Sequence, residues 1–302
     1  MNNSEAETLV NKIRSFSTQF DRLSGPFRVD PATGNELAFD KFIAEDWRRN
    51  TYGNAMIKLR LLTENNFKII EQMSLLAVSR YVFELSVWLR LFQKDVTYCL
   101  VYYRELLESQ LKHYRDLLEH LKREVELLKR FEGLEETSIK DLGKAKPSSD
   151  FGELMQKAMS RVDAEANRSF SLYLEDAKQN GYGFQAYLVE KKALPKAEEA
   201  ISQIQIEIRE FENKFPKKVQ ELAKKRWQWR RMAEEAGIQH EHDYIYAYAS
   251  KLLHATPSSL TTDEKHLEMY EICIFLRYIH TKMLEIMDLA YMQPECKLKA
   301  MS

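Results

Sequence analysis

An all-α protein, built as a helical bundle with a projecting antiparallel coiled-coil hairpin, is the fold class that three features of this sequence predict. Glycine and proline are scarce, with 9 and 7 residues among 302, while charged residues make up 30%. This composition favours long helices over a turn-rich β fold. Apolar residues recur at spacings of three and four along most of the chain. Two of these apolar stripes are long enough to pair with each other, which predicts the hairpin.

Charge and cysteine content exclude several broad classes of protein. The 45 lysines and arginines are balanced by 46 acidic residues, so the net charge is -1 and no global field attracts nucleic acid or membrane. Three scattered cysteines form no CxxC pair, which indicates a reducing compartment. The first residues do not resemble a signal peptide, and no apolar run reaches the roughly eighteen residues of a membrane span. We expect a cytoplasmic protein with no membrane partner.

The two ends of the chain are expected to build the globular part of the protein. Residues 5–23 carry apolar side chains at helical spacing, and the turn-forming run GPFRVDPATGN follows at 25–35. We therefore expect an N-terminal arm at 1–40. It packs on a globular helical bundle made from 41–95 and 216–302.

Two charged residues interrupt the apolar stripe of a helix expected at about 59–93. The stripe passes through Leu76 and Val87 but also through Arg80 and Glu84. An exposed pair at this spacing contributes only about a few tenths of a kcal/mol. Buried charges, in contrast, are costly unless they are paired and hydrogen-bonded. Because aromatic residues flank the pair, we expect partial burial, and the pair marks either a structural ion network or a polar pocket.

Residues 96–215 are expected to form the coiled-coil arm. A first helix at about 96–131 carries an apolar seam that alternates spacings of four and three, through Leu107, Leu111, Tyr114, Leu118, Leu121, Val125 and Leu128. A second seam lies at about 195–215, and a seam of this kind needs a partner helix in the same chain or in another one. Between the seams we expect a polar linker near 133–150 and a helix at about 151–178.

A basic segment with interleaved tryptophans follows Pro216. One helix is expected at about 217–236, ended by Gly237. Four of its side chains are candidates for ligand binding: Lys225, Arg226, Trp227 and Arg230. Basic residues with aromatic neighbours can follow a phosphate backbone and stack on bases. The competing interpretation is a solvated cationic face whose tryptophans turn into the core.

A short helix expected at about 244–254 places three polar side chains on one side. Tyr246, Ser250 and His254 follow one another at spacings of four, so the serine and the histidine can hydrogen-bond. A serine nucleophile also needs a histidine held by an orienting partner. Glu84 can be that partner only if the fold brings the two helices together. The alternative is a histidine that is satisfied within the core.

His240 and His242, followed by Asp243, form a weak candidate for a metal site. The H-x-H pattern carries little weight without a further ligand at a known spacing. Asp243 is more simply the N-cap of the following helix. We expect no metal and no cofactor, and a metal-dependent hydrolase at the two histidines is kept as a third possibility.

Two blocks of sequence together resemble a known family. They are SRYVFELSVWLRLF at 79–92 and KKRWQWRRMAEEAGIQHEHDYIYAYASKLLHATPSSL at 224–260. The order of helices is also similar to that of a large bacterial all-helical family known only as a domain of unknown function. The resemblance implies a shared pocket made from the recurring polar positions Arg80, Glu84, Trp227, Tyr246, Ser250 and His254. It implies no reaction, and Ala255 stands where many members have glycine.

The leading hypothesis is a polar pocket that binds a phosphate-bearing ligand, either RNA or a nucleotide. Arg80 and Tyr246 would hold the ligand, the basic segment would attract the phosphate backbone, and His254 would act as acid or base. Glu84 and Ser250 complete the set of catalytic candidates. A stress or phage-defence effector is the expected setting, and whether the protein is an enzyme stays open. The alternative is a non-enzymatic module whose coiled-coil arm binds a protein partner or forms a homo-oligomer.

Overall fold

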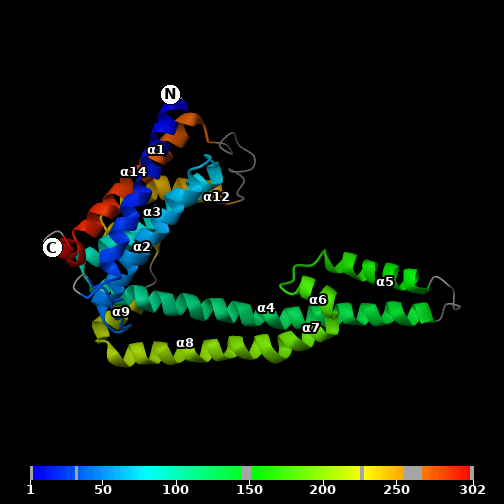
Figure 1. Cartoon of the computed structure of the whole chain (residues 1–302). Coiled ribbons are helices and arrows are strands. Elements are labelled where there is room, and N and C mark those ends of the chain that lie inside the picture. Colours follow the sequence, from blue (N-terminus) through cyan, green and yellow to red (C-terminus); the bar gives the residue numbers. More distant parts are fainter. Residues whose placement is uncertain (1–2, 31–32, 144–150, 225–227, 255–266, 300–302) are drawn as a thin grey trace. The chain divides into compact units, whose positions relative to one another are not determined.

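The computed structural model describes residues 3–30, 33–143, 151–224, 228–254 and 267–299 (Figure 1). Within these residues the chain is helical and contains no strand, apart from an isolated β-bridge between Val29 and Glu36. The predicted all-α fold class is therefore confirmed. The chain divides into two compact units, which are described separately below. Unit 1 contains Met1–Arg104 and Phe215–Ser302, and unit 2 contains Glu105–Lys214.

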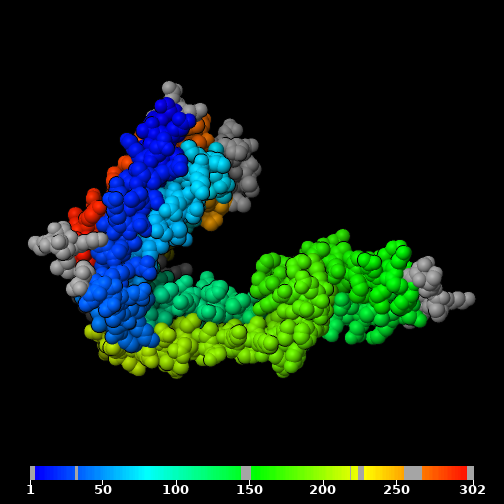
Figure 2. Space-filling model, in the orientation of Figure 1, coloured from blue at the N-terminus to red at the C-terminus, as the bar shows by residue number. Residues whose placement is uncertain are grey.

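Four long helices form the core of unit 1. They are α1 (Asn3–Ser24), α2 (Ala44–Asn66), α3 (Gln72–Lys94) and α14 (Met269–Tyr291). α1 packs on α2 and α14, and α14 also packs on α3. Ile13 and Phe20 of α1 are fully buried, as is Ile279 of α14. The N-terminal apolar stripe is thus explained by a helix of the bundle core. In Figure 2, α1, α2 and α3 form much of the visible face of unit 1.

The helix expected at 59–93 is wrong, because two helices occupy this region. α2 ends at Asn66 and α3 begins at Gln72. Phe67 follows α2 and is buried, whereas Ile69 in the connection is 81% exposed. The sequence pattern missed the break because no glycine or proline marks it.

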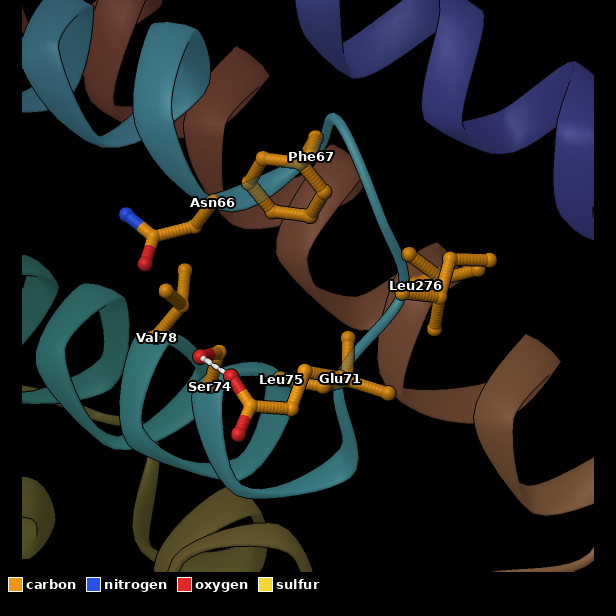
Figure 3. A pocket seen from close by; sticks show the side chains of 8 residues that line it. Asn66, Phe67, Glu71, Ser74, Leu75, Val78 and Leu276 are labelled. Atoms are coloured by element: carbon orange, nitrogen blue, oxygen red, sulfur yellow. Dashed lines mark hydrogen bonds between the residues drawn. The ribbon is translucent and has the colours of Figure 1, made fainter.

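The connection between α2 and α3 leaves a narrow crevice against α14 (Figure 3). Asn66, Phe67, Ile70, Glu71, Ser74, Leu75, Val78 and Leu276 line it. Its charged residue is already engaged, because the hydroxyl of Ser74 donates to the carboxylate of Glu71 at 2.8 Å. The crevice is too narrow to admit a water molecule. Its size makes it a feature of side-chain packing.

Shorter helical segments complete unit 1. They are η1 (Gly25–Phe27), α9 (Lys217–Lys224), α10 (Trp229–Glu235), α11 (Gln239–Glu241), η3 (His242–Tyr246), α12 (Ala247–Leu253) and α15 (Pro294–Lys299). The single basic helix expected at 217–236 is wrong, because Gln228 has an extended backbone with φ -105° and ψ 142°. Gly237 adopts φ +76° after α10, as the predicted helix stop requires.

Unit 2 is made of helices α4 to α8. α4 (Thr97–Gly143) begins in unit 1 and continues through unit 2. It is followed by α5 (Phe151–Ala166), α6 (Leu174–Asn180), α7 (Tyr182–Leu188), the π-helical η2 (Val189–Ala193) and α8 (Leu194–Lys214). The linker expected near 133–150 is helical as far as Gly143, and residues 144–150 lie outside the described part of the chain. The helix expected at 151–178 already ends at Ala166.

The core of unit 2 contains the second half of the α4 seam. Leu121, Val125, Leu128 and Phe131 form one buried cluster with residues of α5, α6, α7, η2 and α8. In the same unit, the carboxylate of Glu124 is almost fully buried and accepts hydrogen bonds from the backbone N–H groups of Leu172 and Tyr173. This carboxylate therefore holds the connection between α5 and α6. The knobs-into-holes packing of a coiled-coil hairpin stays a prediction.

Within the described residues, no helix combines the length and the apolar character that a membrane span requires. Even α14, whose positions are apolar on most sides, contains Lys282 and Glu285. These two residues belong to an ion network described in the next subsection.

Candidate functional site

Arg80 and Tyr246 meet in unit 1, although they lie far apart in the sequence. α3 provides Arg80 and the π-helical η3 provides Tyr246, and Nη2 of Arg80 donates to the hydroxyl of Tyr246 at 3.1 Å. The guanidinium carbon lies 4.9 Å from the centre of the phenol ring, which is a cation–π contact. The tyrosine therefore fixes the orientation of the arginine by both its ring and its hydroxyl.

Glu84 lies one turn after Arg80 and completes a three-residue polar group. Its carboxylate is 3.4 Å from Nη2 of Arg80, and the two side chains are 29% and 27% exposed. Burial raises the pKa of Glu84, while the charge of Arg80 and hydrogen bonds from Arg80 and Tyr246 oppose this rise. Burial, together with the charge of Glu84, also raises the pKa of Tyr246. The carboxyl group thus holds its proton more readily than an exposed glutamate does.

Aromatic side chains surround Tyr246. The imidazole of His242 stacks on its ring at 5.1 Å between centroids, and the ring of Phe83 lies 5.0 Å away. Trp229 of α10 lies 6.2 Å from the same ring. His242 and Tyr246 are the two ends of η3, and single π-helical turns occur frequently at functional sites. The sequence signal for His242 as a partner of Tyr246 is its spacing of four from that residue, whereas the H-x-H pattern points only to metal binding.

Asp243 connects the edge of this group to the basic segment. The predicted N-cap role is wrong, because Asp243 lies inside η3 and its carboxylate is 3.0 Å from Nδ1 of His242. Nε of Arg230 approaches the same carboxylate at 3.3 Å. The hydrogen bond from His242, then the charge of Arg230, lowers the pKa of Asp243. Of the four ligand-binding candidates in this segment, the structure describes Arg230. Lys225, Arg226 and Trp227 lie outside the described residues.

Ser250 and His254 do not form the hydrogen bond that their spacing predicted. α12 ends at Leu253, and His254 has an extended backbone with φ -93° and ψ 145°. The helical geometry that places residues four apart side by side is therefore lost at this position. The hydroxyl of Ser250 is buried and has no hydrogen-bond partner among the described residues. His254 lies on the exposed surface, so a serine nucleophile activated by this histidine is not assembled.

A second polar group, missed from the sequence, is an ion network centred on Lys282 of α14. The Lys282 side chain is 4% exposed, and its ammonium group is 2.7 Å from the carboxylate of Glu241 and 2.5 Å from that of Glu285. Arg90 of α3 also binds Glu285, and Tyr278 donates to Glu241 at 2.9 Å. Burial raises the pKa of Glu285, but hydrogen bonds from Arg90 and Lys282 outweigh this effect and lower the pKa.

The ion network and the Arg80 group share one support. Glu241 binds Lys282, and the next residue, His242, stacks on Tyr246. The network therefore fixes η3 to α14 and α3. Its sequence signal is the presence of Lys282 and Glu285 among the closely spaced apolar residues of α14. The network supports the site structurally and is not a site itself.

Comparison with known proteins adds one finding. Residues 153–271 match the profile of DUF5677, a family of unknown function. The resemblance to a domain of unknown function is thereby confirmed. The DUF5677 match includes the block at 224–260, with Tyr246, whereas the block at 79–92, with Arg80, lies outside it. No curated protein and no solved structure matches the chain. The match assigns no activity to DUF5677.

Metal ligation finds no support in the described part of the chain. There, no three side chains of histidine, cysteine, aspartate or glutamate are placed to hold one ion. His242, half of the H-x-H pattern, stacks on Tyr246 and contacts Asp243. What the site offers chemically is a fixed guanidinium, a phenol, a carboxyl group with a raised pKa and several aromatic rings.

Proposed function

We propose that unit 1 binds a phosphate-bearing ligand, RNA or a nucleotide, at Arg80 and Tyr246. The observation that supports the proposal is that only one nitrogen of the Arg80 guanidinium group is hydrogen-bonded among the described residues. Both polar contacts of Arg80, to Tyr246 and to Glu84, use Nη2, so Nε and Nη1 have no partner among the described residues. Arginine donors in a fixed plane match the geometry of phosphate oxygens. Because the ring of Tyr246 already orients the guanidinium, little side-chain entropy is lost on binding.

The aromatic residues beside Arg80 support a ligand that also carries a base. The rings of His242 and Trp229 each lie beside the ring of Tyr246, at 5.1 Å and 6.2 Å between centroids. Nucleobases stack on such rings with a gain of roughly 1–3 kcal/mol per base. Arg230 places a further cation beside the same group through its contact with Asp243. A combination of arginines and stacked rings suits single-stranded RNA or a nucleotide better than inorganic phosphate.

Glu84 is the residue that we propose for proton transfer if the bound ligand reacts. Its contact with Arg80 would bring the carboxyl group next to a phosphate bound by that arginine, and its pKa is raised by burial. A perturbed carboxyl beside a cation is a common arrangement for acid–base chemistry. His254, the acid or base expected from the sequence, and Ser250 have no contact with Arg80 that supports such a role. A cytoplasmic stress or phage-defence effector of bacterial origin stays the expected setting.

The test compares RNA binding by the wild type with binding by Arg80→Gln. A short fluorescently labelled single-stranded RNA is titrated with the protein over a series of salt concentrations. We expect weaker binding and a salt slope that falls by about 1, because one phosphate contact is lost. Arg60→Gln is the matched control, since Arg60 is also a partly buried arginine paired with a glutamate four residues later. Equal affinity of Arg80→Gln and wild type would refute the proposal.

The alternative, an interaction module, is supported by exposed apolar residues of unit 2. Phe170 is 79% exposed and Phe184 is 54% exposed, and the seam residues Leu111 and Leu118 are only partly buried. Such residues are common where a second chain binds. Leu111→Gln with Leu118→Gln would then change the oligomeric state measured by light scattering, without changing RNA binding. An unchanged oligomeric state would exclude self-association through the seam.

A further inference from the structure

A cavity of about 250 Å³ lies between η3, α12 and α14, and it is independent of the Arg80 group. Its lining residues are Tyr244, Ile245, Tyr248, Tyr270, Glu271, Ile274 and Phe275. Phe275 and Ile245 are buried and form the inner surface. Tyr244 and Tyr270 are 60% and 48% exposed, so both phenol rings are accessible to a ligand from solvent. Among the described residues the lining is therefore aromatic and aliphatic, with one carboxylic acid.

That acid, Glu271, is held in place at both oxygens. The hydroxyl of Tyr248 donates to Oε1 at 2.6 Å, and the backbone N–H of Glu268 donates to Oε2 at 2.8 Å. The second contact belongs to the capping box at the start of α14. Neither hydrogen bond comes from a cationic group, so neither offsets the charge of the carboxylate that would attract a cationic ligand. The ring of Tyr248 is itself fixed, because it stacks on Phe275 at 5.9 Å.

Among the described residues at the start of α14, the electrostatic balance is negative. The N-terminus of α14 contributes roughly half a positive charge. Glu268 and Glu271 contribute two negative charges at the same helix end, and they outweigh the helix dipole. Consistent with this balance, the charge of Glu271, followed by burial and the charge of Glu268, raises the pKa of Tyr270. A cation is therefore favoured at this position and an anion such as a phosphate is not.

We propose that this cavity binds a small organic ammonium cation, of the trimethylammonium type, between the tyrosine rings and Glu271. The faces of aromatic rings carry negative charge and attract cations, most strongly where water is excluded. Methyl groups on the nitrogen match the apolar lining, and the carboxylate provides the opposite charge. Sites for drug-sized ligands span about 300–1,000 Å³, so this cavity suits a head group rather than a whole nucleotide.

The probe is choline, compared with its uncharged isostere 3,3-dimethylbutan-1-ol. Binding to the full chain is followed by calorimetry or by the chemical shifts of the tyrosine rings. We expect choline to bind at least about fivefold more tightly than the alcohol, since cation–π contacts at partly exposed rings contribute roughly 1 kcal/mol. Equal binding of the two compounds would overturn the proposal, because shape and apolar contact alone would then explain the affinity. Absence of choline binding would overturn it as well.

Two variants separate this cavity from nonspecific binding. Glu271→Gln removes the charge but keeps a capping-box side chain, so α14 should retain its N-terminal hydrogen bonds. We expect it to weaken choline binding about three- to tenfold and to leave the affinity for the alcohol unchanged. Tyr270→Leu should also weaken choline binding, whereas Tyr291→Leu, at an exposed tyrosine at the other end of α14, should not. Wild-type affinity in both Glu271→Gln and Tyr270→Leu would place the cation elsewhere.

Discussion

Nη2 of Arg80 lies 3.1 Å from the hydroxyl of Tyr246, although 166 positions separate the two residues. α3 and η3 are the elements that make this contact, and they pack on each other in unit 1. The same nitrogen also approaches Glu84 at 3.4 Å. One arginine therefore connects a phenol and a carboxyl group, so that a change in any of the three alters the other two.

The first prediction concerns the pKa of Glu84. The charge and hydrogen bond of Arg80, and then the hydrogen bond of Tyr246, hold this pKa below the value that burial alone would produce. We expect Arg80→Gln to raise the pKa of Glu84 strongly and Tyr246→Phe to raise it less, because the arginine contribution is larger. A carbon-detected NMR titration of the Glu84 carboxyl measures both shifts. A larger rise in Tyr246→Phe than in Arg80→Gln would contradict the described contacts.

The second prediction is the pH dependence of stability in Glu84→Gln. The folded pKa of Glu84 is raised above that of the unfolded chain, where glutamate titrates near about 4.3. The protonated form therefore stabilises the fold at lower pH, and this contribution is lost as pH rises through the folded pKa. Glutamine does not titrate, so the variant should gain stability relative to the wild type as pH rises above about 4.3. Urea unfolding at a series of pH values measures the difference.

All four tryptophans of the chain lie in unit 1, so their fluorescence reports the unfolding of this unit. A difference between Glu84→Gln and wild type that is constant with pH would show that the folded pKa of Glu84 is unperturbed. The result would then remove the basis for assigning Glu84 to proton transfer. Glu285→Gln is the control, because the pKa of Glu285 is lowered in the folded protein.

The third prediction is that stability depends on pH in the opposite direction at Glu285. Despite burial, hydrogen bonds from Arg90 and Lys282 lower its pKa in the folded protein. Its stabilisation is therefore present above the unfolded pKa and is lost as pH falls through the folded value. Glu285→Gln should destabilise unit 1 at neutral pH by about 3 kcal/mol, because the buried Lys282 loses one of two carboxylate partners. The loss should shrink in acid, as followed by tryptophan fluorescence in urea.

A loss below about 0.5 kcal/mol at neutral pH, typical of a surface substitution, would contradict the network. The double variant Glu285→Gln with Lys282→Met sharpens this test. If the single variant is destabilised by an uncompensated ammonium group, removing that group should recover part of the lost stability. Additive losses would show that Lys282 and Glu285 act independently.

The helical fold was predictable because its signals are local. The predicted bounds of α1 and of α8, which carries the second seam, differ from the observed bounds by no more than two residues. Gly25 and Pro216 mark the ends of these helices in the sequence. The sequence predicts a linker that begins at Gly133, but one helical glycine costs only about 1 kcal/mol. The flanking residues support the helix, as the contact between Lys140 and Glu136 shows. Polar composition alone does not separate a solvated helix from a linker.

The candidate site was predictable only in part, because its contacts depend on the tertiary fold. Arg80 stood out as a charge within an apolar stripe, which is visible in the sequence. The partners of Lys282 and the stacking of His242 come from distant segments and carry no local signal. The predicted contact between Ser250 and His254 requires a helix that includes both residues, and α12 ends at Leu253, one residue too early.

The fourth prediction uses two glycines of unit 2. Gly133 lies within α4, and an added Cβ atom meets no atom within 4 Å. Gly133→Ala should therefore stabilise unit 2 by about 0.5–1 kcal/mol, because alanine is the better helix former. Gly181 also has open space around it, but its φ of +93° is a conformation that L residues rarely adopt. Gly181→Ala should cost about 1–3 kcal/mol of strain.

Far-UV circular dichroism during urea unfolding measures both changes, since unit 2 contains no tryptophan. The two substitutions add the same methyl group in open surroundings, so backbone conformation is the difference that decides the sign. A neutral or destabilising Gly133→Ala would mean that residue 133 lies in a linker, as its composition first indicated, and not in α4. A harmless Gly181→Ala would mean that the chain does not turn through a positive φ between α6 and α7.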